Sequence, residues 1–179
     1  MNPVFLIGYM GSGKSTIGRK LADELGWHFI DTDVFIEARF RQRVSDMFDT
    51  VGEEVFRRRE RVVIEELSGM QDCIIATGGG LPCHSDNMKL LTASGLTVYL
   101  SASDEALASR LELCKRTRPT IRHKSGAELL SHVSEAMSSR RLVYQTAKLV
   151  LPVEHLSSPE DELKLAKELA TRLRSLDPW

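Results

Sequence analysis

The stretch LIGYMGSGKSTIG, at residues 6–18, contains the pattern Gly-x-x-x-x-Gly-Lys-Ser/Thr. The pattern falls on Gly8, Gly13, Lys14 and Ser15. The apolar run at 4–7 is typical of a strand buried on both faces. After the loop, apolar residues recur every four positions, which predicts a helix over 14–25. A strand, a glycine-rich loop and a helix in this order predict a phosphate-binding loop in a parallel α/β fold.

Each part of this loop is suited to holding a nucleotide. Glycines leave backbone N–H groups free to surround phosphate oxygens, and the positive end of the helix dipole points to the same place. Lys14 adds a charge for the β- and γ-phosphates, and the Ser15 hydroxyl is a ligand for Mg²⁺. The expected nucleotide-binding residues are Gly11, Ser12, Gly13, Lys14, Ser15 and Thr16. The alternative is a glycine-rich turn that binds nothing, and the loop alone does not separate a kinase from a motor, a GTPase or a switch.

Further apolar runs of strand type follow the first, with helical patterns between them. The expected strands are 4–7, 28–30, 73–76, 96–100 and 149–151, and the expected helices are 14–25, 34–42, 53–68, 85–94, 104–113, 126–139 and 159–175. Such alternation predicts a three-layer αβα fold around a five-stranded parallel sheet. With 179 residues, of which 42% are hydrophobic, the chain can bury one core. We therefore expect a single domain over 1–179.

Composition argues against several classes of function. The 24 basic and 25 acidic residues give a formal charge of −1, whereas nucleic-acid binding needs a basic excess on one face. A basic leader and a long apolar run are both missing from the sequence, so we expect neither export nor a membrane span. The three cysteines are scattered and lack metal-ligand spacing, which favours reduced thiols. We expect a cytoplasmic monomer that binds neither nucleic acid nor membrane.

Two carboxylates, Asp31 and Asp33, stand where the second strand ends in FIDTD. The carboxyl ends of parallel strands line the ligand crevice, and residues two apart in a strand share a face. We expect one carboxylate near Mg²⁺ and the other near an acceptor hydroxyl, as phosphoryl transfer requires. The alternative is that one of them only caps the next helix.

The third strand ends in ATGGG, with three consecutive glycines at Gly78, Gly79 and Gly80. Glycines here expose backbone N–H groups to the crevice and leave room for a small polar substrate. A tight turn before Pro82 is the alternative.

The segment EEVFRRRERVVIEEL, at 53–67, places Glu60 on an apolar helix stripe. A buried carboxylate needs a partner, and Arg57 lies one turn earlier on the same side. We expect the remaining arginines, Arg58, Arg59 and Arg61, to form a solvated face.

Two more basic segments stand near the expected crevice. CKRTRPTIRHKSG, at 114–126, is basic, contains a proline and ends in glycine. Such a long loop in a compact domain predicts a mobile lid, with a solvated basic connector as the alternative. Arg140 and Arg141 precede Tyr144, and one of the two arginines could reach the crevice.

Taken together, these motifs point to a family: from about residue 3 to residue 165 the chain resembles shikimate kinase. The resemblance rests on GYMGSGKST, DTD, FRRRE, TGGG, RPTI and RRLVY, in the order and approximate spacing of that family. It implies a P-loop, nucleoside-monophosphate-kinase-like fold with substrate-binding helices at about 34–68. It also implies that the ATP γ-phosphoryl group is transferred to the 3-hydroxyl of shikimate, in aromatic amino-acid biosynthesis.

The resemblance implies roles for individual residues. Lys14 and Ser15 serve ATP and Mg²⁺, with Asp31 in the Mg²⁺ shell, and Asp33 is the base for the substrate hydroxyl. Lys14 and Arg118 act with Asp33 in catalysis, and Arg110 stacks on adenine. Shikimate is held by Arg57, Gly79, Gly80 and Arg140, with Glu60 orienting Arg57 and with Phe48 and Phe56 as the pocket wall.

Two other functions are compatible with the phosphate loop. A kinase of gluconate or of a nucleoside monophosphate would share it, and gluconate is itself a hydroxy carboxylate. A nucleotide-binding switch would need a partner surface, for which the sequence offers no feature. The Asp-x-Asp pair, the triple glycine and two arginines suited to a carboxylate favour shikimate.

Overall fold

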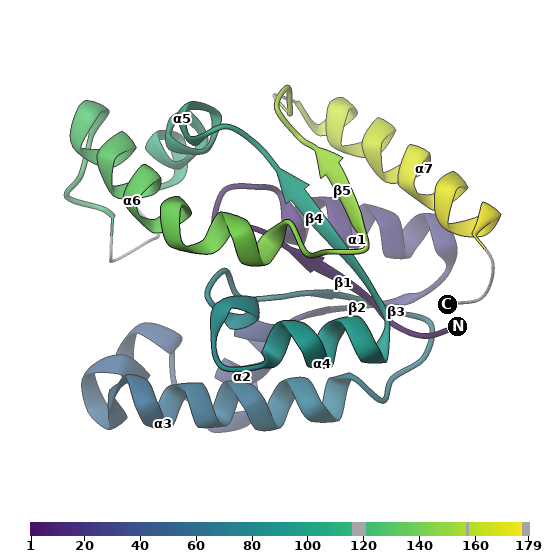
Figure 1. Cartoon of the computed structure of the whole chain (residues 1–179), viewed down its shortest axis with the longest axis horizontal. Helices are drawn as coiled ribbons and strands as arrows, with labels where there is room; N and C mark the ends of the chain where they lie inside the picture. The colour runs from purple at the N-terminus through teal and green to yellow at the C-terminus, as the bar shows by residue number, and fades with distance from the viewer. Residues whose placement is uncertain (116–120, 157, 177–179) are drawn as a thin grey trace.

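The computed structural model describes residues 1–115, 121–156 and 158–176. Its centre is a sheet of five parallel strands in the order β2-β3-β1-β4-β5 (Figure 1). The strands are β1 (Val4–Ile7), β2 (His28–Asp31), β3 (Cys73–Ala76), β4 (Leu96–Ser101) and β5 (Leu149–Pro152). The five-stranded parallel sheet expected from the sequence is confirmed.

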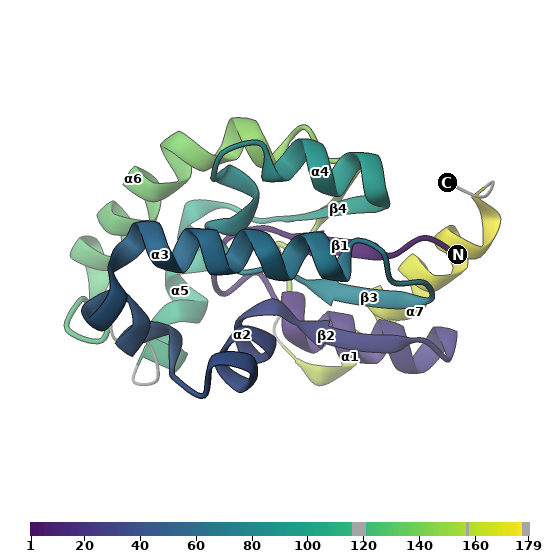
Figure 2. The ribbon, with the colours of Figure 1, turned by 90° about the horizontal axis from the view of Figure 1, so that it is seen from below.

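Helices cover both faces of this sheet. They are α1 (Lys14–Leu25), α2 (Thr32–Phe40), α3 (Val44–Leu67), α4 (Asn87–Ser94), α5 (Asp104–Cys114), α6 (Gly126–Tyr144) and α7 (Pro159–Ser175), with a short 3₁₀ helix η1 (Leu81–Cys83). Figure 2 shows α4 and α6 on one side of the sheet and α1 and α7 on the other, which confirms the three layers. Across residues 1–115, 121–156 and 158–176, every helix is too short or too polar to cross a membrane.

The position of β1 explains its uninterrupted apolar sequence. It lies between β3 and β4 under helices on both faces, and all four of its side chains are 0% exposed. Asp31 at the end of β2 pairs with Ala76 at the end of β3, so these strands end level with each other. The loops that follow β1, β2 and β3 therefore emerge side by side at the carboxyl edge of the sheet.

Helices α2, α3 and α6 differ most from those expected. α2 begins directly after β2, because the Asp31 side chain caps it by accepting from the backbone N–H groups of Asp33 and Val34. α3 begins at Val44 and not at 53, because its first half is separated from the second only by a kink at Gly52, where φ is 79°. α6 runs on to Tyr144, five residues beyond the expected 139. The expected helix 53–68 is thus only the second half of α3.

Candidate active site

A cavity of about 410 Å³ opens at the carboxyl edge of the sheet. Of the predicted site residues, it is lined by Gly11, Gly13, Lys14, Ser15, Thr16, Asp31, Asp33, Gly79 and Arg110. A larger groove of about 750 Å³, between α4 and the end of α6, is lined by none of them. We place the site in the smaller cavity because convergent polar groups, and not volume, identify a site of reaction.

The phosphate loop takes a conformation that depends on its glycines. Gly13 has a φ of 90° and is the N-cap of α1, so the helix begins at Lys14. The Thr16 hydroxyl donates to the Gly13 carbonyl at 3.0 Å and supports this first turn. The amino end of α1 therefore points at the cavity, which is the arrangement that attracts a phosphate group.

Lys14 is the first residue of α1, and its side chain folds back onto the phosphate loop. Its ammonium donates to the carbonyl oxygens of Gly8 at 2.8 Å and of Tyr9 at 2.9 Å. The side chain of Ser12 is buried and does not line the cavity, so the predicted nucleotide contact of Ser12 would be made by its backbone and stays a prediction. Its hydroxyl has no hydrogen-bond partner among the described residues. Only the backbone of Ser12, which donates to the Tyr9 carbonyl at 3.2 Å, shapes the loop.

Ser15 and Asp31, predicted to serve Mg²⁺, are brought together. The Ser15 hydroxyl donates to Asp31 Oδ2 at 2.6 Å, while Asp31 Oδ1 accepts from the backbone N–H of Asp33 at 3.1 Å. One carboxylate thus both caps α2 and faces the phosphate loop. A hydroxyl and a carboxylate oxygen at this spacing suit Mg²⁺, which binds through few protein oxygens and completes its shell with water and phosphate.

Asp33 lies in the first turn of α2, so the expectation that it shares a strand face with Asp31 is wrong. The reason is that β2 ends at Asp31 and the helix starts at once. Burial, together with the nearby carboxylates of Asp31 and Glu60, raises the pKa of Asp33 to about 6, and the charge of Lys14 opposes this rise. Asp33 is therefore much more basic than an ordinary aspartate.

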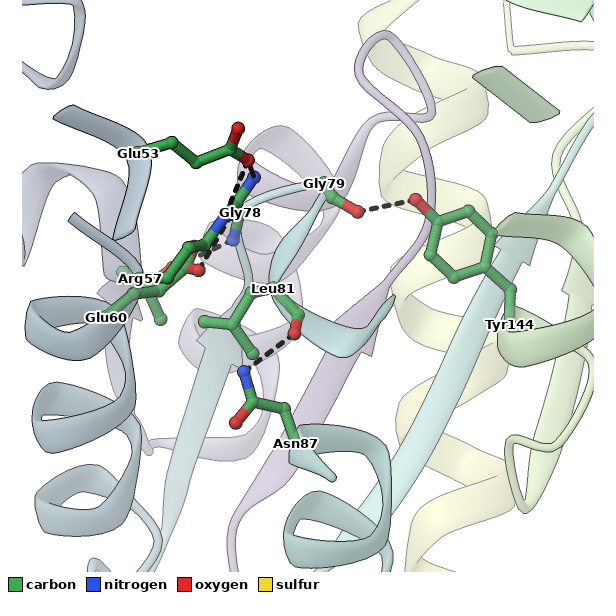
Figure 3. A network of polar contacts seen from close by, with 9 residues as sticks. Glu53, Arg57, Glu60, Gly78, Gly79, Leu81, Asn87 and Tyr144 are labelled. Atoms are coloured by element: carbon green, nitrogen blue, oxygen red, sulfur yellow. Dashed lines mark hydrogen bonds and ion pairs between the residues drawn. The ribbon is translucent and has the colours of Figure 1, made fainter. Parts of the chain in front are cut away.

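The triple-glycine loop packs closely against the carboxylates of Asp33 and Glu60. The Gly78 N–H donates to the buried Thr32 hydroxyl at 2.8 Å. A Cβ at Gly78 would lie 2.6 Å from Asp33 Oδ1 and 3.3 Å from Glu60 Oε1. Only glycine lets the two carboxylates approach this backbone. Beyond the glycines, Asn87 holds η1 by donating to the Leu81 carbonyl at 2.9 Å, as Figure 3 shows.

Arg57 is held by acidic side chains on its own helix, as predicted for Glu60. It donates to Glu60 Oε2 at 2.9 Å and to Glu53 Oε1 at 3.2 Å (Figure 3). Burial raises the pKa of Glu60, and the Arg57 charge lowers it. The guanidinium also lies close to Gly80, where a Cβ would be 3.0 Å from Arg57 Nη2.

An aromatic wall flanks Arg57. The rings of Phe48 and Phe56 are 4.5 Å apart between centroids, and the guanidinium carbon of Arg57 lies 5.8 Å and 5.4 Å from them. Phe48 comes from the first half of α3, the part that the helical pattern did not predict.

Of the two arginines near the end of α6, Arg140 faces the site and Arg141 does not. Arg140 Nη1 would lie 3.9 Å from a Cβ at Gly79, whereas Arg141 forms an ion pair with Asp104 at the start of α5. Arg57 and Arg140 also both act on the half-buried Cys83 thiol: burial raises its pKa, and the two positive charges lower it. The two guanidinium groups therefore both lie close to the glycine loop, Arg57 next to Gly80 and Arg140 next to Gly79.

Arg110 lines the cavity, and part of its guanidinium is used within the protein. Nη2 donates to the carbonyl oxygens of Val153 and Glu154, the latter at 2.9 Å. Nη1 is buried and has no hydrogen-bond partner within the described ranges. Arg110 therefore anchors the loop after β5 beside the phosphate loop, and its predicted contact with adenine stays a prediction.

Three expectations about arginines have different outcomes. Arg59 is not solvated as predicted: its guanidinium carbon lies 4.4 Å above the Phe40 ring, because α2 packs along α3. Arg61 lies at the solvated surface as predicted: its side chain is 31% exposed and pairs with the exposed carboxylates of Glu65 and Asp86. Arg118 falls at 116–120 and lies outside the described residues, so its catalytic role stays a prediction.

Sequence reasoning missed Tyr9, Thr32 and the contact role of Tyr144. Thr32 stands between the two predicted aspartates, and Tyr9 lies inside the phosphate loop. Their positions inside recognised motifs could have marked Tyr9 and Thr32 as site residues. The contacts that these side chains make, however, depend on other segments of the chain.

Comparison with known proteins agrees with this geometry. A family model for shikimate kinase matches residues 10–174. A shikimate kinase of Parabacteroides distasonis is 46% identical over 161 residues, which cover 90% of this chain and 93% of that protein.

Solved structures give the same result. The crystal structure of shikimate kinase from Bacteroides thetaiotaomicron matches with a TM-score of 0.92 at 34% identity, over 97% of this chain and 98% of that one. Shikimate kinase from Acinetobacter baumannii in complex with shikimate matches with a TM-score of 0.85 at 30% identity, over 98% of this chain and 94% of that one.

Proposed function

The chain belongs to the shikimate kinase family, and we propose that ATP and shikimate react in the cavity at the carboxyl edge of its sheet. The protein is an ATP-dependent kinase that phosphorylates shikimate. As the resemblance of its motifs implies, the acceptor is the 3-hydroxyl, and the products are shikimate 3-phosphate and ADP.

The observation that carries this proposal is the position of Asp33. It lies beside Lys14 of the phosphate loop and beside Glu60, the buried partner of Arg57. A carboxylate with a pKa of about 6 is mostly ionised at neutral pH and is still basic enough to accept a hydroxyl proton. This position, between the expected positions of the nucleotide and the acceptor, supports the proposal that Asp33 is the base.

In the proposed reaction, the oxygen of the shikimate 3-hydroxyl attacks the γ-phosphorus of ATP, and Asp33 accepts the proton of that hydroxyl. The bond from the γ-phosphorus to the bridging oxygen breaks, and ADP leaves with the electron pair. Lys14 and the backbone N–H groups of the phosphate loop stabilise the charge on the phosphate oxygens. Ser15 and Asp31 would hold Mg²⁺, which supplies further charge neutralisation at the phosphates. We also propose, from the resemblance, that Arg118 contributes charge at the transferred group.

Arg57 and Arg140 would bind the shikimate carboxylate. Their guanidinium groups both lie close to the loop that carries Gly79 and Gly80, whose backbone would contact the substrate. Planar guanidinium groups bind carboxylates through two parallel hydrogen bonds, which is a geometry that lysine lacks. On the nucleotide side, Arg110 lines the cavity and would contact the adenine, as the resemblance implies.

We further propose that the chain works as a monomer in the cytoplasm, as one domain over 1–179. None of the three cysteines forms a disulfide bond, as suits a reducing compartment.

The experiment is a measurement of ADP release with ATP, Mg²⁺ and a panel of acceptors. Shikimate should stimulate release strongly, while gluconate and nucleoside monophosphates should leave it near the rate without acceptor. A nucleotide-binding switch would instead hydrolyse ATP slowly at one rate with every acceptor. Equal rates with and without shikimate would contradict the proposal.

A further inference from the structure

Arg140 is supported by an aromatic ring from the phosphate loop. Its guanidinium carbon lies 5.6 Å from the centroid of the Tyr9 ring, and Tyr9 is only 1% exposed. This distance is within the range of a cation–π contact, in which the negative face of the ring attracts the positive charge. The residue that follows the first glycine of the phosphate loop therefore contacts the arginine expected to bind the other substrate.

Tyr144 holds the same region from α6. Its hydroxyl donates to the Gly79 carbonyl at 2.5 Å (Figure 3) and lies next to the Arg140 guanidinium. The side chain is fully buried, and its ring packs against Tyr99 of β4 with 5.2 Å between centroids. Tyr144 thus ties the end of α6 to the glycine loop.

The glycine loop lies directly against the phosphate loop. A Cβ at Gly79 would be 3.6 Å from both the Gly8 carbonyl oxygen and the Met10 nitrogen, and 3.9 Å from Arg140 Nη1. The glycine loop therefore packs against the phosphate loop and lies next to Arg140, and both Tyr9 and Tyr144 lie close to this arginine.

The support that Tyr9 provides differs from that of an ion pair. Arg141 is paired with Asp104, which neutralises its charge, whereas among the described residues no carboxylate forms an ion pair with Arg140. A ring face restrains a guanidinium and leaves its N–H donors in the plane, where a carboxylate can meet them. Restraint before binding also reduces the side-chain entropy lost when the substrate arrives.

We propose that Tyr9 and Tyr144 are positioning residues for the shikimate carboxylate: Tyr9 holds Arg140 from the phosphate loop, and Tyr144 holds the glycine loop beside it. This inference rests on the proposed role of Arg140 as a ligand of that carboxylate. Neither tyrosine lines the cavity in which the phosphoryl group would be transferred, so we expect them to affect shikimate affinity and not the chemical step.

Tyr9→Leu tests the first contact, because it removes the ring and keeps a buried apolar side chain. The KM for shikimate should rise about two- to thirtyfold, the range of a cation–π contact, while the KM for ATP changes less than twofold. The Tyr9 carbonyl that binds Lys14 belongs to the backbone and stays in place. Tyr9→Phe restores the ring face and should recover most of the shikimate affinity.

Tyr144→Phe tests the second contact by removing one hydroxyl from a buried ring. Losing the hydrogen bond to Gly79 should raise the KM for shikimate about two- to tenfold with little change for ATP. Tyr99→Phe is the matched control, since it removes a hydroxyl from the neighbouring buried tyrosine and should leave the shikimate KM unchanged.

A double-mutant cycle with Arg140→Ala separates the possible outcomes. If Tyr9 acts through Arg140, Tyr9→Leu adds no further loss of shikimate affinity in the Arg140→Ala background. If Arg140→Ala itself leaves shikimate affinity intact, the proposed carboxylate contact fails and the positioning role fails with it. Arg140→Ala could weaken shikimate binding while the tyrosine variants leave it unchanged, or while they weaken shikimate and ATP binding equally. Either result overturns only the positioning role.

Discussion

At the scale of single residues, Asp33 shows how neighbours set the chemistry of a side chain. Its carboxylate is partly buried near Asp31, Glu60 and Glu37, with Lys14 as the opposing charge. The three acidic neighbours and the loss of water disfavour its ionised form. Its pKa of about 6 follows from this surrounding and not from the residue type.

Asp33→Asn should lower kcat at least a hundredfold, because general-base help is typically worth about 10²–10⁴-fold. In the wild-type enzyme, kcat should rise with pH through about 6 as Asp33 loses its proton. The variant should lack this rise. The measurement is the pH profile of shikimate-dependent ADP release, and a variant with the wild-type profile would assign Asp33 to a role other than base.

The same substitution should stabilise the fold at neutral pH. Because the folded-state pKa of Asp33 is raised, the folded chain binds more protons than the unfolded chain between about pH 4 and pH 6. Stability is therefore lost as pH rises through this window, and above it the folded state bears the full free-energy cost of the ionised Asp33. Removing the charge should raise the free energy of unfolding at pH 8 by about 1–3 kcal/mol, with a smaller gain at pH 5. Urea denaturation at both pH values checks this, and equal gains at the two would refute it.

Gly78→Ala should disturb Asp33 directly, because the new Cβ would lie 2.6 Å from Asp33 Oδ1. The carboxylate must move, so we expect kcat to fall about ten- to hundredfold, since a misplacement of about 1 Å can cost on that order. Gly69→Ala is the matched control, because its Cβ would meet only the Glu66 carbonyl oxygen at 3.7 Å. Steady-state kinetics of both variants measure the difference, and equal losses would contradict the steric argument.

At the scale of elements, α3 presents neighbouring arginines to different surroundings. Arg57 lies on the inner side against Glu60, whose side chain is 2% exposed. Arg58, one position later, is 69% exposed and pairs only with Glu54 among the described residues. The kink at Gly52 lets the first half of the same helix bring Phe48 alongside Arg57.

Arg57→Ala should weaken shikimate binding about 10- to 150-fold, the range of a charge-assisted contact, with much less effect on ATP. It should also cost on the order of 3 kcal/mol of stability, because Glu60 is left buried without its partner. Arg58→Ala should do neither. Shikimate titration and urea denaturation of the two variants provide the comparison, and unchanged shikimate affinity in Arg57→Ala would place the carboxylate elsewhere.

At the scale of the whole molecule, the last helix supports the helix that carries the phosphate loop. α7 packs against α1 on the face of the sheet opposite α4 and α6 (Figure 2). Lys20 of α1 donates to Glu162 at 2.7 Å and to the Pro159 carbonyl at 2.7 Å. The residues assigned to shikimate lie on other elements, so the support and the substrate site are separate.

Leu169→Ala should therefore reduce stability without changing substrate affinity. Leu169 is buried in α7, and truncating a buried leucine costs about 2–5 kcal/mol through lost transfer energy and the cavity left behind. Leu163→Ala, on the same helix but 42% exposed, should cost much less. Thermal unfolding and the KM values for both substrates test this, and a large rise in the shikimate KM would show that the two regions are coupled.

The sequence alone determined the phosphate loop, the five parallel strands and the family, because these depend on short contiguous motifs and on local periodicity. It also placed Glu60 against Arg57, because residues three apart on a helix are neighbours whatever surrounds them. These features need no knowledge of how distant segments meet.

The tertiary structure decided the features that depend on several elements at once. The pKa of Asp33 sums charges from α1, β2 and α3, and the burial of Arg59 follows from the packing of α2 on α3. The choice of Arg140 over Arg141 depends on where Asp104 and Tyr9 lie around α6. Electrostatic and packing energies depend on distances in space, and the order of residues along the chain does not specify distances between separate elements.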